Sequence, residues 1–285
     1  VDQSNRTLAR DLNVGVLGVD GKRVEVLETP RIVGNSASGD TRAIRFQASA
    51  QGVTDQSFGL NHPKNYLGYP LALYADGDTA GLLDEYDVVG ATNDARRGSA
   101  FLGLTDETAA GPRLTPLGDE VVRFALDHAG SVEDSLAEFA DWYRSRKRFT
   151  DLAPAWGQLA RRVVWAYPAT PLLVDALQTL HEDGNTEPSL VEFLTHLHRS
   201  HPTFAVELFL RGTESVRTRA LDADGTLHTS ELADGNVYHS PTVFQLKSML
   251  YHVGLLTERG SEPNNLDPTT DIWRLRHPVV EPYSR

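Results

Sequence analysis

A histidine-rich stretch, THLHRSHP, brings His196, His198 and His201 close together, and imidazole nitrogens are common metal ligands. Side chains two positions apart on a helix point to different faces, so only His198 and His201 can converge on one ion. Glu192 shares a helix face with His196, but no second carboxylate accompanies them. The pattern therefore favours a solvated helix end, and we predict no metal and no other cofactor.

A second arrangement that could do chemistry is Asp20-Gly21-Lys22. Many DNA-cleaving enzymes carry an acid followed, two residues on, by lysine, because carboxylates hold Mg²⁺ and the lysine assists the attacking water. Here the triplet lies in a predicted turn and lacks an upstream proline-aspartate partner. A magnesium-dependent nuclease therefore remains only an alternative.

Other enzyme motifs are missing from the sequence. It contains neither GxxxxGK[ST] nor HExxH, and the segment 34–39 has the wrong glycine–serine spacing for a nucleophile elbow. There is no cysteine, which removes disulfides, thiolate metal sites and cysteine nucleophiles together. The prediction leans toward a protein without catalytic residues.

The charge of the chain is strongly negative. Aspartate and glutamate number 39 against 27 lysines and arginines, for a net charge of −12. Only Lys22, Lys64, Lys147 and Lys247 are lysines, and an acidic, arginine-rich chain resembles proteins of salt-loving archaea. A GC-rich bacterial genome is the other explanation. Such a field repels nucleic acid unless local basic patches exist or high salt screens it, with a Debye length of roughly 3 Å at 1 M.

Neither end nor middle of the sequence indicates a membrane protein. The first fifteen residues lack the apolar run of a signal peptide, and no stretch approaches the roughly 18 apolar residues that span a bilayer. We expect a cytoplasmic protein without a membrane partner. Its elements predict an α+β fold in four parts: an N-terminal β module at 1–58, a first helical module at 59–128, a helical linker at 129–168, and a second module with a β insertion at 169–285.

The first module reads as helices, a hairpin and a closing helix. Thr92 caps a predicted helix from about Asn93 to Ala100, in which Ala95, Ser99 and Leu102 face inward. The outward face then carries Asn93, Arg96 and Arg97. The segment TDETAAGPR predicts the hairpin, and Thr115 with Pro116 starts the next helix.

The later parts follow similar rules. In the linker, Ser131 and Asp134 approximate a capping box, and a predicted helix ends in the run Arg144-Ser-Arg-Lys-Arg148. In the last part, a helix starts at Ser240-Pro241 and ends at Gly254, with two strands after it. Its expected core stripe is Val243, Leu246, Leu250 and Val253.

Residues 79–125, including the ending RLTPLGDEVV, resemble the winged helix-turn-helix superfamily, and residues 239–276 resemble a second copy. The resemblance covers about a third of the chain and implies tandem winged helices. Many members of the superfamily bind double-stranded DNA, and some bind only protein. Tandem copies occur in regulators, replication initiators and DNA-recognition modules of restriction systems.

The resemblance assigns contacts to three regions. The recognition helix and hairpin of the first copy offer Thr92, Asn93, Arg96, Arg97 and Arg113, because arginine can pair with guanine and asparagine with adenine. The second copy offers Thr242, Gln245, Lys247, Ser248, His252, Arg259, Asn264 and Asn265, with Gln245, Ser248 and His252 on one outward face. The basic run Arg144, Arg146, Lys147 and Arg148 either clamps phosphates or complements a helix dipole.

We therefore expect a DNA-binding protein that recognises a specific site: a regulator, an initiator or a specificity component of a defence system. The first alternative is a protein-interaction scaffold that docks subunits of a larger complex. It is favoured if Asp84, Glu85 and Asp87 dominate the recognition face. The second alternative is the nuclease.

Overall fold

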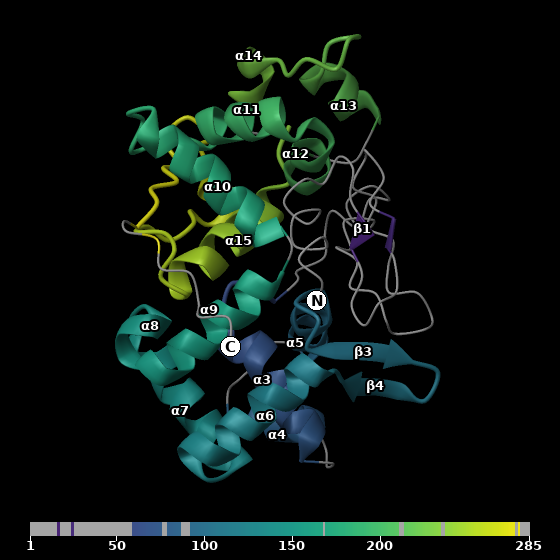
Figure 1. Cartoon of the computed structure of the whole chain (residues 1–285), viewed down its shortest axis with the longest axis vertical. Coiled ribbons are helices and arrows are strands. Elements are labelled where there is room, and N and C mark those ends of the chain that lie inside the picture. The colour runs from purple at the N-terminus through teal and green to yellow at the C-terminus, as the bar shows by residue number, and fades with distance from the viewer. Residues whose placement is uncertain are drawn as a thin grey trace. The chain divides into compact units, whose positions relative to one another are not determined.

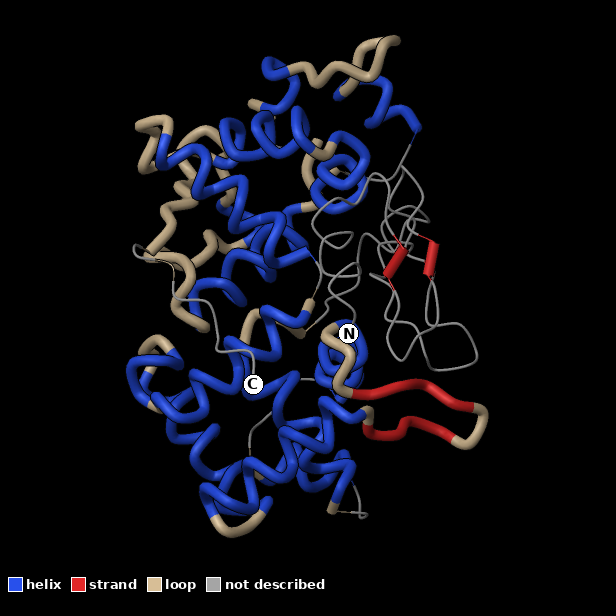
Figure 2. The backbone as a smooth tube through the Cα atoms, in the orientation of Figure 1, coloured by secondary structure: helices blue, strands red, loops and turns tan. Residues whose placement is uncertain are grey.

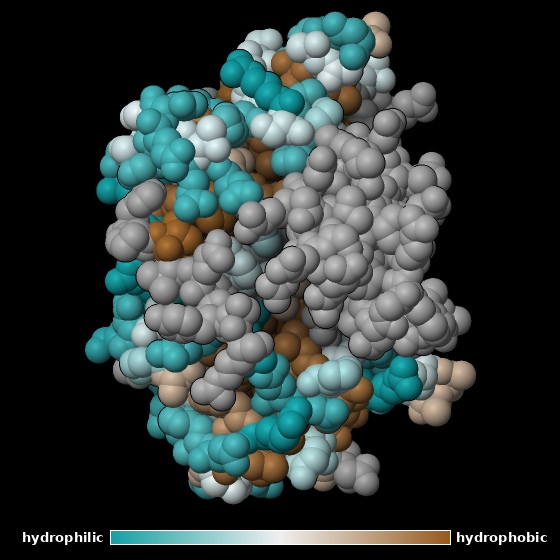
Figure 3. Space-filling model, in the orientation of Figure 1, coloured by the Kyte–Doolittle hydropathy of each residue, from teal (hydrophilic) through white to brown (hydrophobic). Residues whose placement is uncertain are grey.

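The computed structural model describes residues 16–17, 24–25, 59–75, 79–86, 92–167, 169–210, 214–234, 237–276 and 279. These residues are mostly helical, with two two-stranded antiparallel sheets (Figure 1). The α+β prediction is thus confirmed at a coarse level. In the part of the chain described, no helix has the length and apolar character needed to cross a membrane. On the face shown in Figure 3, the described surface is mostly hydrophilic.

Two compact units divide the chain. Unit 2 comprises the described residues of 57–167 and 248–255, and unit 1 those of 168–247 and 256–279 with the first two strands. The segment predicted as a linker, 129–168, falls almost entirely in the same unit as 59–128. The helix at 240–252 is divided between the units, with 240–247 in unit 1 and 248–252 in unit 2.

Unit 2 begins with three helices, continues through a hairpin and ends with four further helices. Its elements are α3 (Pro63–Tyr74), α4 (Thr79–Glu85), α5 (Thr92–Phe101), β3 (Thr105–Thr108), β4 (Gly111–Leu114), α6 (Pro116–Ala129), α7 (Val132–Ser145), α8 (Phe149–Leu152) and α9 (Pro154–Ala166). The helix α3 is central and packs against α4, α5, α6 and α7. Its side chains Tyr66, Leu67 and Leu71 are fully buried. The order from α4 to α6 is the order expected from the sequence.

Capping residues fix where the helices of unit 2 begin. The Thr115 hydroxyl accepts a hydrogen bond from the Gly118 amide, with Pro116 in the first turn of α6. The Ser131 hydroxyl accepts from the Asp134 amide at 3.0 Å and starts α7. Both caps were predicted from the sequence and are confirmed.

The hairpin is attached closely to its flanking helices. Strands β3 and β4 pair in antiparallel register from Thr105↔Leu114 to Thr108↔Gly111. At the base of the hairpin, the Thr115 hydroxyl donates to the Gly103 carbonyl at 2.7 Å. A Cβ at Gly118 would lie 2.1 Å from the Leu104 carbonyl oxygen. Only glycine therefore allows α6 to approach the backbone at Leu104 this closely. The hairpin thus packs against α5 through β3 and against α6 through β4.

Unit 1 contains the remaining elements. They are β1 (Val16–Leu17), β2 (Val24–Glu25), α10 (Ala169–Glu182), α11 (Leu190–Ser200), α12 (Pro202–Phe209), α13 (Glu214–Ala220), α14 (Thr229–Leu232), α15 (Ser240–His252, divided as above) and the 3₁₀ turn η2 (Pro263–Asn265). Isolated antiparallel bridges join Ser189 to Ile272 and Leu256 to Leu275. The two strands expected after α15 are thus present as a single bridge.

Two short strands, β1 and β2, lie where the sequence predicts the N-terminal hairpin. Val16 pairs with Glu25 and Leu17 with Val24, as expected for a hairpin around Asp20-Gly21. The triplet Asp20-Gly21-Lys22 and the strand expected at 41–49 lie outside the described residues.

The core of unit 1 gathers around α11 and α15. Ser189 and Glu192 form a capping box at the start of α11. Phe193 stacks on Trp273 with ring centroids 4.8 Å apart, and Phe209 meets the same indole edge-on. The expected stripe of α15 is almost fully buried, with Val243 and Leu246 in unit 1 and Leu250 and Val253 in the segment assigned to unit 2. That prediction is confirmed.

The histidine-rich stretch behaves differently from its prediction. His198 is 9% exposed, because it points from α11 into the unit and not to solvent. His196 and His201 are half-buried. Among the described residues, no three or more histidines, aspartates and glutamates are grouped to hold a metal ion. The stretch is part of the packing of unit 1.

We expect His198 to make the fold sensitive to acid. Burial lowers the pKa of His198 below its ordinary value of 6.5. As pH falls through 6.5, the unfolded chain binds the proton first, so stability present above 6.5 is lost on acidification. The Tm of the His198→Gln variant should therefore fall less between pH 7.5 and pH 5 than the Tm of the wild type. An equal loss of Tm in the two proteins would show that His198 does not carry this sensitivity.

Candidate nucleic-acid interface

Helix α5 has one face fixed in the core and one face open to solvent. Ala95 and Ser99 are fully buried, and the Ser99 hydroxyl donates to the Tyr66 carbonyl of α3 at 2.6 Å. Leu102, just after the helix, is 2% exposed. The inward face predicted from the sequence is confirmed. This anchoring sets the direction in which the remaining side chains of α5 point.

The arginines of α5 differ in exposure. Arg97 is exposed, and Arg96 is half-buried. An Arg97 guanidinium nitrogen lies 4.0 Å from an Asp94 carboxylate oxygen, with 43% of the arginine side chain exposed. A solvent-exposed pair at this distance contributes about 0–1 kcal/mol, so the guanidinium can exchange one anionic partner for another. The side chains of Thr92 and Asn93 lie outside those described.

The β3–β4 hairpin projects from the helices of unit 2 (Figure 2). Arg113 on β4 is opposite Asp106 on β3, with 3.7 Å between guanidinium and carboxylate. The Arg113 side chain is 59% exposed, whereas that of Asp106 is 14% exposed. The arginine therefore presents the cation outward and the aspartate is the more shielded partner.

Acidic residues accompany this surface. Asp84 and Glu85 at the end of α4 are both exposed. Asp87, the third acid considered from the sequence, lies outside the described residues. The face of α4 is thus negative where it is described, while the exposed charges of α5 and β4 include arginines. The module presents both signs of charge on neighbouring elements.

The basic run after α7 divides into outward and inward side chains. Arg144, Arg146 and Lys147 are exposed. Arg148 is half-buried, lies 3.8 Å from Asp151, and stacks over the Tyr251 ring at 4.5 Å. Arg148 is therefore held by contacts within the protein. The other three form an exposed surface that we call the basic corner: Arg144, Arg146 and Lys147.

The face predicted for the second recognition helix is not exposed. The polar side chains of α15 predicted as contacts are all buried, with exposures from 0% to 6%: Thr242, Gln245, Lys247, Ser248 and His252. The expectation assumed that α15 buries only the stripe containing Leu246 and Leu250. Instead the helix is buried on all sides between Thr242 and Leu250, so its polar groups are internal. The outward face predicted for Gln245, Ser248 and His252 is therefore wrong, and the candidate contacts Thr242 and Lys247 are buried with them.

Internal hydrogen bonds account for the burial of Lys247. Its ammonium donates to the Asp271 carboxylate at 2.8 Å, and each side chain is 2% exposed. The Ser261 hydroxyl donates to the same carboxylate at 3.0 Å, and the Trp273 indole N–H donates to its other oxygen at 2.9 Å. Because a buried charge requires such compensation, Lys247 is a structural residue.

The loop after α15 keeps three predicted residues at the surface. Arg259, Asn264 and Asn265 are exposed, the last two in η2. The Arg259 guanidinium lies 5.7 Å from the Phe244 ring centroid. All three side chains are therefore accessible from solvent.

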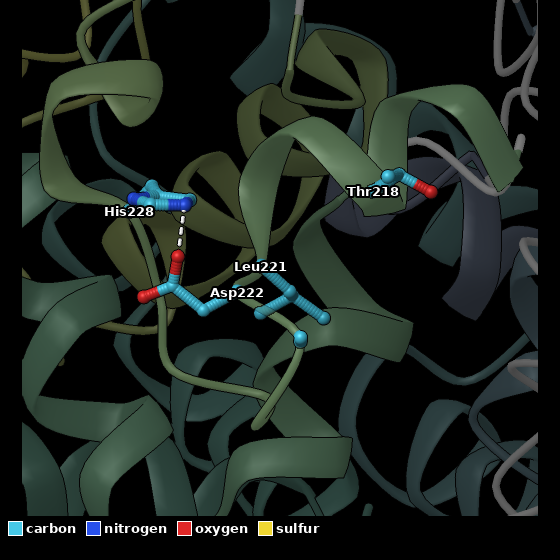
Figure 4. Close-up of a pocket in the computed structure, with 5 residues that line it drawn as sticks. Thr218, Leu221, Asp222 and His228 are labelled. Carbon is cyan, nitrogen blue, oxygen red and sulfur yellow. Dashed lines mark ion pairs between the residues drawn. The ribbon is translucent and has the colours of Figure 1, made fainter.

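A shallow pocket of about 500 Å³ lies in unit 1 beside the turn at 222–226. In Figure 4, Asp222 and His228 point toward one another as an ion pair. Thr218 lies apart from them on α13 (Figure 4). The side chains of Asp222 and His228 are each about two-fifths exposed. The turn is held by its own backbone, because the Asp222 amide donates to the Thr226 carbonyl at 2.8 Å.

This arrangement lacks the geometry of a catalytic triad, since the Asp222–His228 pair has no nucleophile beside it among the residues that line the pocket. The strongly raised tyrosine pKa values also have a structural cause. Burial raises the pKa of Tyr66, Tyr167 and Tyr238 far above 10.0. Such tyrosines stay neutral and pack in the core.

Searches of protein-family models, curated proteins and solved structures found no match to this chain. Among the predicted contact residues, those that the structure shows exposed are Arg97, Arg113, the basic corner, Arg259, Asn264 and Asn265.

Proposed function

We propose that the protein binds double-stranded DNA through helix α5 and the β3–β4 hairpin of unit 2, as a winged helix does. The supporting observation is that consecutive elements present Arg97 and Arg113 outward. The Thr115 hydroxyl bonds the end of the hairpin to Gly103, directly after α5, and α5 packs against β3. A pair of cations on a helix and an adjoining hairpin suits the regular surface of a duplex.

In this proposal α5 enters the major groove, whose width of about 12 Å accepts a helix. Arg97 pairs with guanine O6 and N7, and Arg113 contacts backbone phosphate from the hairpin. Both guanidinium groups are exposed and lie 3.7–4.0 Å from their carboxylate partners, so exchanging these partners for DNA costs little. Arg97 thus determines the sequence preference, and Arg113 fixes the position of the protein on the duplex.

The net charge of −12 shapes the binding that we expect. Long-range repulsion between the acidic chain and DNA weakens association at low salt, and added salt screens it. Local phosphate contacts have the opposite salt dependence, because salt competes with them. We therefore expect a shallower salt dependence than for a basic DNA-binding protein with the same contacts.

The experiment compares single variants on a duplex selected by the wild type from random and genomic fragments. Arg97→Ala should weaken binding to the selected duplex by about 1–3 kcal/mol, or roughly 5- to 150-fold, and flatten the preference over other sequences. Arg113→Ala should weaken binding to all duplexes alike and lower the slope of log K against log salt by about one. Fluorescence anisotropy over a salt series measures both.

Arg199→Ala is the matched control, because Arg199 is exposed on α11 in unit 1. It removes the same charge and should leave preference unchanged. Unaltered affinity and preference in both Arg97→Ala and Arg113→Ala would reject the proposed interface.

A second function is favoured by the exposed Asp84 and Glu85 of α4. Exposed carboxylates on α4, the helix that precedes α5, suit a basic protein partner, and the module would then act as a scaffold. Asp84→Asn with Glu85→Gln should strengthen DNA binding if DNA is the ligand, because it removes repulsion near phosphates. A protein scaffold would instead lose its partner with no gain in DNA affinity.

A further inference from the structure

The end of helix α7 holds a residue in an unusual backbone conformation. Arg146 has φ 56°, in the left-handed region, and it is the one non-glycine residue with positive φ among those described. Where other helices of the described chain are followed by a left-handed residue, that residue is glycine: Gly103, Gly130, Gly184 and Gly254. Glycine takes this conformation without the steric cost that a Cβ brings. An arginine here therefore sacrifices stability that glycine would supply.

The surrounding turn is firmly held. The Trp142 indole N–H donates to the Lys147 carbonyl at 3.0 Å, and the Ser145 hydroxyl donates to the Trp142 carbonyl. Trp142 is 2% exposed and its ring lies 4.9 Å from that of the fully buried Phe149. The backbone that bears Arg146 and Lys147 is thus anchored on both sides. Their side chains start from fixed positions at the surface.

The charges of this corner are incompletely neutralised. Arg144 pairs with exposed Asp141 at 2.9 Å, and Arg148 lies near Asp151. Within the described residues, no carboxylate forms an ion pair with Arg146 or Lys147. A helix dipole explains a cation in the last turn, such as Arg144, but it does not require arginine at the left-handed position. Arg146, the residue with the left-handed backbone, is thus one of the two cations without an ion pair among the described residues.

We propose that the basic corner, Arg144, Arg146 and Lys147, is a second contact surface for the phosphates of duplex DNA. This inference rests on the proposed function and extends it from α5 and the hairpin to the end of α7. The strain at Arg146 is retained because its cation binds phosphate. On an acidic chain, an anchored group of cations is a place where a polyanion can approach.

The test is Arg146→Gly, which separates stability from binding. Glycine relieves the strain, so Tm should rise by about 1–3 °C. Affinity for the selected duplex should fall several-fold near 0.1 M salt, and the salt slope should lose about one unit. Arg146→Lys keeps the charge and the strained backbone and should retain most of the affinity. Arg123→Ala, which removes an exposed arginine from α6, is the control for net charge.

Two outcomes overturn the inference while the proposed function stands. One is wild-type binding of duplex with an unchanged affinity and slope in Arg146→Gly, whatever its Tm. The other is an equal loss of duplex affinity in Arg123→Ala, which would show that only the net charge of the protein matters. Absence of any duplex binding by the wild type overturns both proposals. Binding of phosphatidylserine vesicles that depends on Arg146, without an Arg146 effect on duplex, would assign the corner to a membrane surface and reject the DNA contact.

Discussion

Asp271→Ala is expected to lower the free energy of unfolding by about 3–5 kcal/mol, because it leaves the Lys247 ammonium buried without a counter-charge. The carboxylate accepts hydrogen bonds from Lys247, Ser261 and Trp273, and both members of the ion pair are 2% exposed. Removing the carboxylate leaves these three hydrogen-bond donors without an acceptor. Urea unfolding followed by circular dichroism measures the loss.

Two companion variants show which part of that loss is the stranded charge. Lys247→Met with Asp271→Leu removes both charges and should recover most of the stability, since apolar pairs often replace buried ion pairs without cost. Ser261→Ala removes one donor and should cost about 1 kcal/mol. An Asp271→Ala protein within 1 kcal/mol of the wild type would contradict the buried network.

Trp156→Ala is expected to destabilise the protein by about 3–5 kcal/mol, the usual cost of truncating a large buried ring. Trp156 is fully buried on α9, with its ring 4.9 Å from Phe124 of α6 and 4.7 Å from Phe139 of α7. Its indole N–H also donates to the Glu138 carboxylate at 2.8 Å. The side chain thus joins three helices of unit 2.

Trp156→Phe separates packing from hydrogen bonding. Phenylalanine keeps most of the ring contacts and loses the bond to Glu138, so the cost should be about 1–2 kcal/mol. Because Trp156 lies in the core and away from the exposed arginines, this variant should bind DNA as the wild type does. Equal stability of the alanine and phenylalanine variants would contradict the packing role of the ring.

Local signals predicted much of unit 2. The caps Thr115 and Ser131, the inward side chains Ala95 and Ser99, and the hairpin at 105–114 follow from rules that act within a few residues. Such rules do not reveal which elements share a core. For that reason the sequence suggested a separate linker at 129–168, whereas α7 packs against α3.

The error at α15 has a related cause. A polar residue on the face opposite a core stripe usually points to solvent, and Lys247 and Gln245 follow that pattern. The rule fails when a helix is buried on both sides and a distant residue compensates the charge. Asp271 is 24 positions from Lys247, so local periodicity carries no sign of their pairing. The left-handed conformation of Arg146 was likewise invisible, because the sequence rules assign that conformation to glycine.

Hydrogen exchange with and without the selected duplex is the most direct measurement of the proposed interface. Amide exchange should slow in α5 (92–101), in the hairpin (105–114) and in the turn that follows α7, while α10 and the loop of Asp222 exchange as before. Slowed exchange confined to other segments, with residues 92–114 unchanged at saturating duplex, would contradict the account.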